Sequence, residues 1–346
     1  MKKRVGFPNA LLFYKFSILW TTFFQELGAE IVISPKTNKI IKDLGVKFAP
    51  DEDCYSTKLY FGHTLYLKDK VDFLFIPRIG SDHEVNVGCP KFIALAEVLK
   101  SMFPDLPKII MPFFSMAKKN HGRFKILRII FSIGFRFTLN PFRILIAGKR
   151  AFDAQSKYDE ELKFSEEELH KWENSKIFLQ NLSIQEQRKT PLRIALVGHP
   201  YVINDDFSSV NIKNLLLSRG IDIITPDQMP KALIENQMEK LDYNMYFNYA
   251  REILGTTMHF IENNSIDGIL QLIIFSCGPD SLIGEMSARY SSRKPGTPLL
   301  QLVLDELSSE TGVLTRIEAF LDMIERKNEF RRNEENCHLH SLILDH

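Results

Sequence analysis

The sequence predicts an α/β protein of two parallel sheets covered by helices, and an internal duplication is the main reason. The first half begins with an apolar run at residues 4–7 that ends at Pro8, and the second begins with one at residues 193–197 that ends at Gly198-His199-Pro200. Short apolar runs that stop at Gly/Pro turns are typical of buried parallel strands. Two such starts in one chain predict two sheets.

Each half then continues in the same order. A helical stretch is followed by a glycine C-cap, a strand and a proline stop, and two further strands come later. In the first half the helix is expected at residues 11–27, with strands at 28–35, 71–76 and 108–111; in the second, the helix at 210–219, with strands at 220–226, 268–275 and 298–304. Strands separated by helices indicate parallel sheets with both faces covered.

A length of 346 residues suits two domains better than one core. The middle of the chain is helical in pattern, and Ser165 with Glu168 predicts a capping box there. Beyond a helix at residues 315–327, the polar end is expected to fray. The predicted organisation is a first α/β domain at 1–115, a helical connector at 116–190, a second α/β domain at 191–327 and a polar tail at 328–346.

Charge and hydropathy exclude several classes of protein. The formal net charge is +1, so no global field draws the chain to nucleic acid or anionic lipid. The start has no apolar signal region, and the most apolar stretch, residues 126–147, contains three arginines that are costly in hydrocarbon. We therefore expect a cytoplasmic protein with no membrane span and no nucleic-acid partner.

Three cysteines occupy positions where parallel sheets bind ligands. Cys89 follows the third strand of the first half, and Cys277 follows the equivalent strand of the second, each in a Gly/Pro turn. Cys54 follows a short apolar piece at residues 46–49. If the two sheets face each other, all three thiols converge in one cleft, about 6–7 Å apart if they bind one cluster. Free cysteines can equally be small buried hydrophobes, and zinc sites usually contain a local Cys-x2-Cys pair, which the chain lacks.

Several motifs resemble the 2-hydroxyacyl-CoA dehydratase superfamily, in particular the branch related to the dehydratase activase proteins. The resemblance covers roughly residues 3–326. The motifs are Gly6-Phe7-Pro8-Asn9-Ala10-Leu11, Leu27-Gly28-Ala29-Glu30, Cys89-Pro90-Lys91-Phe92, Cys277-Gly278-Pro279-Asp280, Leu304-Asp305-Glu306 and Thr315-Arg316-Ile317-Glu318-Ala319-Phe320. The chain departs from the branch near Leu307, Ser309 and Thr311, where the usual pattern has His, Gly and Ala.

The resemblance implies two flavodoxin/Rossmann-like domains that face a cleft and a [4Fe-4S] cluster bound by Cys54, Cys89 and Cys277. In the dehydratases an ATP-driven activase passes an electron to such a cluster, and the acyl-CoA substrate loses water through a ketyl radical. This chain contains no Walker A sequence, so a separate activase-type ATPase would be the electron donor. Acyl-CoA is the implied substrate, and both homodimers and heterodimers are compatible with the sequence.

Other residues are weaker candidates. His199, Asp305 and Glu306 lie at strand ends and are candidate catalytic groups, although a turn histidine and capping or ion-paired carboxylates are the plainer interpretations. The remaining candidates are His63 and His83 as ligands or proton donors, Arg78 as an anion or ion-pair partner, the basic aromatic segment 118–150 as a CoA-phosphate or partner site, and the tail motif Cys337-His338-Leu339-His340. For the basic segment and the histidines, a structural role is the favoured interpretation.

Two classes of function follow. The first is an iron–sulfur enzyme component, a dehydratase or an ATP-dependent reductase, whose cluster has one iron without a protein thiolate. The alternative is an electron-transfer or cluster-carrier protein with no substrate of its own. A binding module with metal-free thiols is a third hypothesis.

Overall fold

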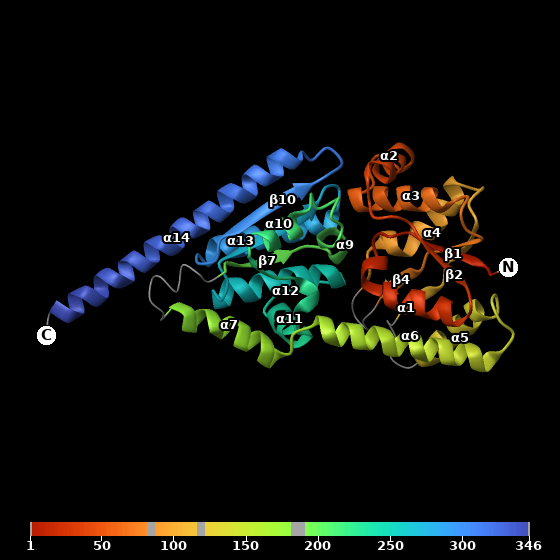
Figure 1. Cartoon of the computed structure of the whole chain (residues 1–346), viewed down its shortest axis with the longest axis horizontal. Helices are drawn as coiled ribbons and strands as arrows, with labels where there is room; N and C mark the ends of the chain where they lie inside the picture. The colour runs from red at the N-terminus through yellow and green to blue at the C-terminus, as the bar shows by residue number, and fades with distance from the viewer. Residues whose placement is uncertain (1, 82–86, 116–121, 181–190, 345–346) are drawn as a thin grey trace.

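The computed structural model describes residues 2–81, 87–115, 122–180 and 191–344, which form two lobes, each built on a four-stranded parallel sheet (Figure 1). The first sheet has the order β2-β1-β3-β5 and the second the order β10-β9-β7-β8. The strands are β1 Arg4–Phe7, β2 Glu30–Ile33, β3 Phe73–Phe75, β5 Lys108–Ile110, β7 Arg193–Val197, β8 Asp222–Ile224, β9 Gly268–Ile274 and β10 Leu299–Leu304. When the strands of each sheet are numbered by their order along the chain, both sheets have the strand order 2-1-3-4. The predicted two-sheet α/β fold is therefore confirmed.

The helices of the first lobe that come before the helical middle of the chain are α1 Phe13–Glu26, α2 Lys39–Phe48, α3 Tyr55–Leu67 and α4 Pro90–Met102. Gly28, with φ of +86°, turns the chain out of α1 into β2. The side chain of Asn38 accepts from the Ile41 amide and caps α2. An aromatic core of Phe7, Phe24 and Phe75 packs between the sheet and α1.

A second, two-stranded parallel sheet, β4 Arg78–Ser81 with β6 Phe113–Ser115, extends the first lobe and was not predicted. Each of these strands follows a proline, Pro77 or Pro112, that marks the end of the preceding strand in the sequence. The chain bends there and then pairs again, because a proline at a strand start costs no ladder hydrogen bond.

The second lobe surrounds a fully buried β9. Residues of β7, β9 and α12 make up much of its core, among them Ala195, Ile269 and Phe260. Its helical elements are α9 Pro200–Ile203, α10 Ile212–Ser218, the 3₁₀ turn η2 Pro226–Gln228, α11 Lys231–Met238, α12 Asn248–Asn263, α13 Gly278–Arg293 and α14 Glu310–Leu344.

The middle of the chain is helical, as predicted, and its helices divide between the lobes (Figure 1). They are α5 Gly122–Gly134, α6 Pro141–Leu162 and α7 Glu166–Gln180. Gln155 of α6 bonds to backbone groups of α1 at Leu19 and Lys15, at 3.1 Å each. Helix α7 lies on the second lobe. The capping box at its start is confirmed, since Ser165 N donates to Glu168 at 2.7 Å and Glu168 N to Ser165 Oγ at 3.2 Å.

The end of the chain corrects a prediction. The last helix was expected to stop at residue 327 and to leave a frayed polar tail at 328–346, but α14 continues to Leu344. Residues 328–344 contain no glycine or proline. Polar composition alone does not stop a helix, since Glu, Arg and Asn all continue one at little cost.

Within the described residues, no helix combines the length and hydropathy needed to cross a bilayer. The apolar stretch at 126–147 is divided between α5 and α6, and the break covers residues 135–140. Asn140 caps α6 by accepting from the amides of Phe142 and Arg143.

Candidate functional site

The three predicted cysteines occupy equivalent places, each as the N-cap of a helix. Cys54 precedes α3, Cys89 precedes α4 and Cys277 precedes α13. All three are partly buried free thiols. The strands of the two sheets run toward each other in Figure 1, so the loops at their carboxyl ends meet between the lobes.

The structure brings the three thiols into one region. Burial is the main cause that raises the pKa of Cys277, Asp280 raises it next, and the thiols of Cys54 and Cys89 raise it further. Burial likewise raises the pKa of Cys89, and Cys54 adds to the shift. A small cavity of about 40 Å³ is lined by Cys89 and Cys277. The two thiols of the first lobe therefore lie near enough to Cys277 to raise its pKa across the lobe boundary.

Donors surround each sulfur. The backbone amide and the hydroxyl of Thr57 bond to Cys54, whose Sγ lies 3.1 Å from Thr57 Oγ1. The amides of Lys91 and Phe92 bond to Cys89, and the amide of Asp280 bonds to Cys277. These are first-turn amides, and the positive ends of three helices meet here. Burial outweighs these bonds in the metal-free protein and keeps the thiol pKa values raised, but the same donors favour a bound anionic group.

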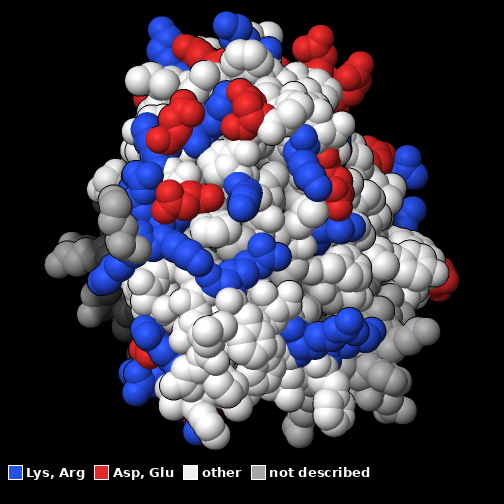
Figure 2. Space-filling model, turned by 90° about the vertical axis from the view of Figure 1, so that its right-hand side faces the viewer, with Lys and Arg blue, Asp and Glu red and all other residues white. Residues whose placement is uncertain are grey.

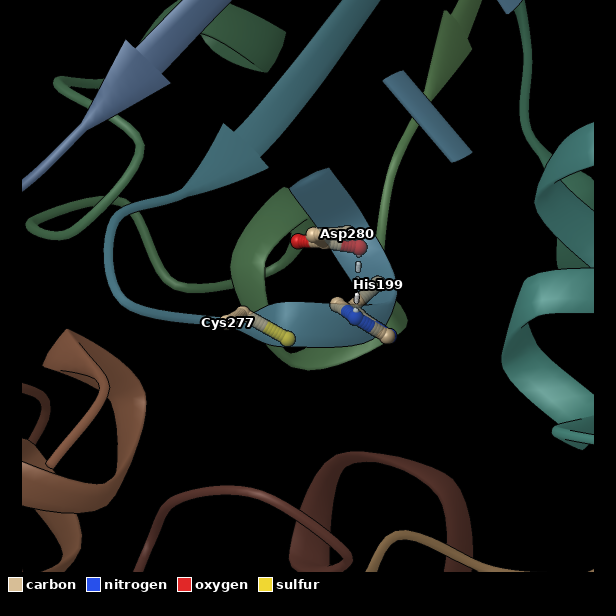
Figure 3. A group of neighbouring side chains, drawn as sticks. All are labelled: His199, Cys277 and Asp280. Carbon is tan, nitrogen blue, oxygen red and sulfur yellow. Dashed lines mark ion pairs between the residues drawn. The ribbon is translucent and has the colours of Figure 1, made fainter. Parts of the chain in front are cut away.

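His199 lies beside Cys277 (Figure 3). It is the N-cap of α9 and is almost fully buried. Its Nε2 lies 2.8 Å from Asp280 Oδ1, but the geometry is that of an ion pair without an aligned hydrogen bond, and both ring nitrogens lack a hydrogen-bond partner among the described residues. One donor atom each from His199, Cys277 and Asp280 lies within 4.8 Å of the others. This group has the composition of a metal-binding set.

Aromatic side chains enclose the histidine. The ring of Tyr201 stacks on His199 with centroids 4.7 Å apart, and Tyr249 meets it edge-on at 5.4 Å. Phe92 of the first lobe contacts both tyrosine rings. Burial raises the pKa of Tyr201 well above its usual range, so its hydroxyl stays neutral. The result is an aromatic wall on one side of the cavity.

The other two candidate catalytic residues have structural partners. Asp305 accepts from the Leu307 amide at 2.9 Å and from Ser308 Oγ at 2.8 Å, so it caps a turn after β10. Glu306 lies 2.6 Å from the buried Lys58 of α3 and joins the two lobes. Neither carboxylate lines the cavity of Cys89 and Cys277.

The weaker candidates have structural roles or lie outside the description. His63 is buried between Ser34 and Thr37, at 2.8 Å and 3.0 Å, and burial lowers its pKa to about 3. Arg78 donates to the Ile93 carbonyl at 2.8 Å and pairs with Glu97. His83 and the side chains of Cys337, His338 and His340 lie outside the described residues.

Sequence reasoning missed a polar network that clamps the lobes. Asp205 of the second lobe is buried and accepts from Thr37 of the first, while His63 bonds to Thr37 as well. Tyr14 also bonds to Asp205, and burial is the main cause that raises the pKa of both groups. No local sequence motif predicts this network, because its residues come from separate parts of the chain. Asp280, in contrast, was visible in the Cys277-Gly278-Pro279-Asp280 motif but was not assigned a role.

The fold and the site define a two-lobed α/β protein whose lobes meet at three helix-capping thiols and a buried histidine. The chain belongs to the family described as CoA enzyme activase uncharacterised domain (DUF2229), which matches residues 4–229. This match includes Cys54, Cys89 and His199 and ends before Cys277. The family relates to the acyl-CoA dehydratase activases, in agreement with the broader part of the resemblance. Among curated proteins, none matches the chain.

Proposed function

We propose that this protein is an iron–sulfur component of the 2-hydroxyacyl-CoA dehydratase type, with a [4Fe-4S] cluster bound by Cys54, Cys89 and Cys277. The observation that carries the proposal is the meeting of three cysteine N-caps at the boundary of two duplicated sheets. Cys54 and Cys89 both add to the raised pKa of Cys277, so the three partly buried sulfurs lie near one another, and a soft metal group would bind them as thiolates.

The donor set fits such a group. Thiolates are soft ligands that suit iron–sulfur clusters, and the amide donors at the three helix starts stabilise sulfur-bound negative charge. When bound, the cluster would supply a low-potential one-electron centre with an iron that lacks a protein thiolate. His199 lies beside Cys277 with its Nε2 paired to Asp280, and its Nδ1 has no hydrogen-bond partner among the described residues, so the histidine would be available to a bound cluster.

The chain's own residues define the surroundings. Asp280 holds His199 in place through the 2.8 Å contact, and its other oxygen accepts from the Ile274 amide at 3.0 Å. Tyr201, Tyr249 and Phe92 line the cavity beside Cys89 and Cys277 and make that wall apolar. The electron would come from a separate activase-type ATPase, since the sequence contains no Walker A motif. An acyl-CoA is the substrate class that the family name supports.

One observation favours a second candidate. The cavity beside Cys89 and Cys277 is about 40 Å³, which holds a water molecule but no organic substrate. A protein that only transfers electrons or carries the cluster needs no room for an organic substrate. An acyl-CoA that broadens or shifts the anaerobic EPR signal would favour the enzyme component, and an unchanged signal would favour the carrier.

Anaerobic purification followed by iron, acid-labile sulfide and EPR measurements tests the cluster. About four irons and four sulfides per chain are expected. Alanine at Cys54, Cys89 or Cys277 should each lower the iron content strongly, whereas Cys337→Ser serves as the matched control and should leave it unchanged. One tightly bound zinc without sulfide would instead indicate a mononuclear site at His199, Cys277 and Asp280 and would refute the cluster.

A further inference from the structure

The basic segment at residues 118–150 has no role in the proposed function, and it lies within a stretch that contains no acidic residue. Between Asp105 and Asp153 there is no acidic residue. Over the same span the basic residues are Lys108, Lys118, Lys119, Arg123, Lys125, Arg128, Arg136, Arg143, Lys149 and Arg150. The net charge of the whole chain hides this local excess, but electrostatic attraction acts over about 8–10 Å in physiological salt, so the local charge is what a nearby surface meets.

The same segment leaves its apolar side chains in solvent. Leu139 is 87% exposed, Phe124 79% and Phe142 74%, and all three lie on α5, on α6 or in the turn between them. Other exposed apolar side chains on these elements are Leu127, Phe135, Leu145, Ile146 and Phe152. We call α5, the turn at 135–140 and residues 141–152 of α6 the basic-apolar hairpin. Exposed patches of this kind mark an interaction surface.

The hairpin is held firmly on the first lobe. Gly134 and Gly148 allow close approach of Ile144 and Ile130, so the two helices pack tightly against each other. Arg143 donates to the Glu26 carbonyl at 2.9 Å, and Arg150 pairs with the Glu26 carboxylate at 2.8 Å. The exposed side chains are thus presented on a fixed support.

Most of the hairpin's charge is not neutralised by the chain. Among the described residues, no acidic side chain pairs with Lys125, Arg128, Arg136, Arg143 or Lys149. The lower part of Figure 2, where the first lobe carries these helices, shows a broad uncharged surface bordered by blue patches, with very little red.

We propose that the basic-apolar hairpin docks the protein onto an anionic lipid surface. Basic residues beside exposed phenylalanine and leucine are the composition of helices that lie in a membrane interface, and each Lys or Arg near such a surface contributes about fivefold in affinity. This docking is independent of the thiols and requires no span, in agreement with the absence of a spanning helix in the described part of the chain.

The shape of the hairpin favours lipid over a protein partner. The most exposed apolar side chain described on the hairpin, Leu139, lies in the turn between α5 and α6, which is at the outer end of the lobe (Figure 1). Protein interfaces place their strongest contacts in well-packed pockets, whereas a lipid interface accepts a convex apolar tip. A second copy of the chain would bring like charges together, which disfavours a symmetric dimer through this face.

Vesicle co-sedimentation with the full chain tests the proposal. Phosphatidylcholine vesicles with about 30% phosphatidylserine should bind the protein in 0.1 M salt, and binding should fall at least tenfold in 1 M salt or on pure phosphatidylcholine. Leu139→Ser with Phe142→Ser should weaken binding by about tenfold or more, because two inserted side chains are lost. Arg136→Glu with Lys149→Glu should nearly abolish it.

Two control variants are matched in exposure and lie elsewhere. Leu307→Ser in the second lobe and Lys100→Glu at the end of α4 should leave vesicle binding unchanged. Circular dichroism should show that every variant keeps the wild-type helix content. The proposal would be overturned if the wild-type protein did not bind anionic vesicles, or if the variant with Leu139→Ser and Phe142→Ser bound them as well as the wild type. A sedimentation coefficient that falls on replacement of Phe142, without any vesicle binding, would assign the face to a second copy.

Discussion

Helices α2 and α3 cross at two glycines, and this crossing supports the loop that carries Cys54. A Cβ built on Gly62 would lie 2.0 Å from the Ile41 carbonyl oxygen, and one on Gly45 would lie 2.0 Å from the Lys58 carbonyl oxygen. Both obstacles are backbone atoms of the facing helix, so no side-chain rotation can relieve them. We predict that Gly62→Ala forces the helices apart.

The size of the effect follows from the distances. Real Cβ atoms essentially never come closer than 3.0 Å to such an atom, so α3 would have to shift by about the 1.0 Å that is missing. Overpacking a core usually lowers the free energy of unfolding by about 1–3 kcal/mol. We expect a loss near the upper end of this range, because a backbone atom cannot move aside as a side chain can. A loss of about 3 kcal/mol lowers the melting temperature by about 6–12 °C for a unit of 150–250 residues.

Thermal unfolding followed by circular dichroism measures this shift. The control is Gly312→Ala in α14, where the nearest atom, Ser309 Cβ, is 4.0 Å away. Alanine there should be neutral or stabilise the helix by up to about 1 kcal/mol. A Gly62→Ala protein that melts with the wild type would refute the close crossing of α2 and α3. Iron content, measured separately, would report whether the shift reaches Cys54.

Three further predictions concern the boundary between the lobes. Glu306→Gln should destabilise the protein by about 2–3 kcal/mol because it leaves the buried Lys58 charge unpaired; chemical denaturation checks this, and recovery in the double variant with Lys58→Met would assign the pair a structural role. Burial raises the pKa of the Asp205 carboxyl, so the folded state binds its proton more tightly than the unfolded state does. The contribution of Asp205 to stability is therefore full below the unfolded pKa of about 4 and is lost as the pH rises through the folded pKa. Unfolding measured between pH 4 and 7 should show that Asp205→Asn removes this loss of stability with rising pH, and an unchanged slope would contradict the prediction. Ser276→Ala should lower stability by about 1 kcal/mol, since Ser276 Oγ donates to the Glu52 carbonyl at 2.9 Å, and an unaltered melting temperature would exclude this contribution.

The sequence predicted the elements that carry strong local signals. Apolar runs with Gly and Pro turns located the strands of both sheets, and Gly28 and Gly220 have the positive φ that a helix-terminating glycine supplies. The sheet β4–β6 was not predicted because each strand has only a few residues after a proline. The end of α14 was not predicted because its polar residues were interpreted as a tail, although no residue there stops a helix.

The site could be predicted only in part, for a related reason. Spacing placed Cys89 and Cys277 at equivalent strand ends and Cys54 after a short apolar piece, and the resemblance added the cluster that would join them. The partners of His199 could not be read, because Tyr201, Tyr249 and Asp280 reach it from three different elements. Glu306 was a candidate by position, but its buried partner Lys58 lies far away in sequence. Long-range polar contacts depend on how the two lobes dock, and the local sequence pattern does not predict that docking.

The docking of the lobes and the geometry of the thiols depend on the same contacts. Ser276, directly before Cys277, bonds to Glu52, two residues before Cys54. Val87, two residues before Cys89, donates to the Tyr246 carbonyl at 2.8 Å on the segment that leads to Tyr249. Ser276 also has φ of +66°, a strained conformation for a side chain of its kind that persists only where its surroundings hold it. Each thiol is thus tied to the opposite lobe within two residues, so a movement that opens the lobes would also separate the cysteines. A group bound by all three thiols would therefore also hold the two lobes together.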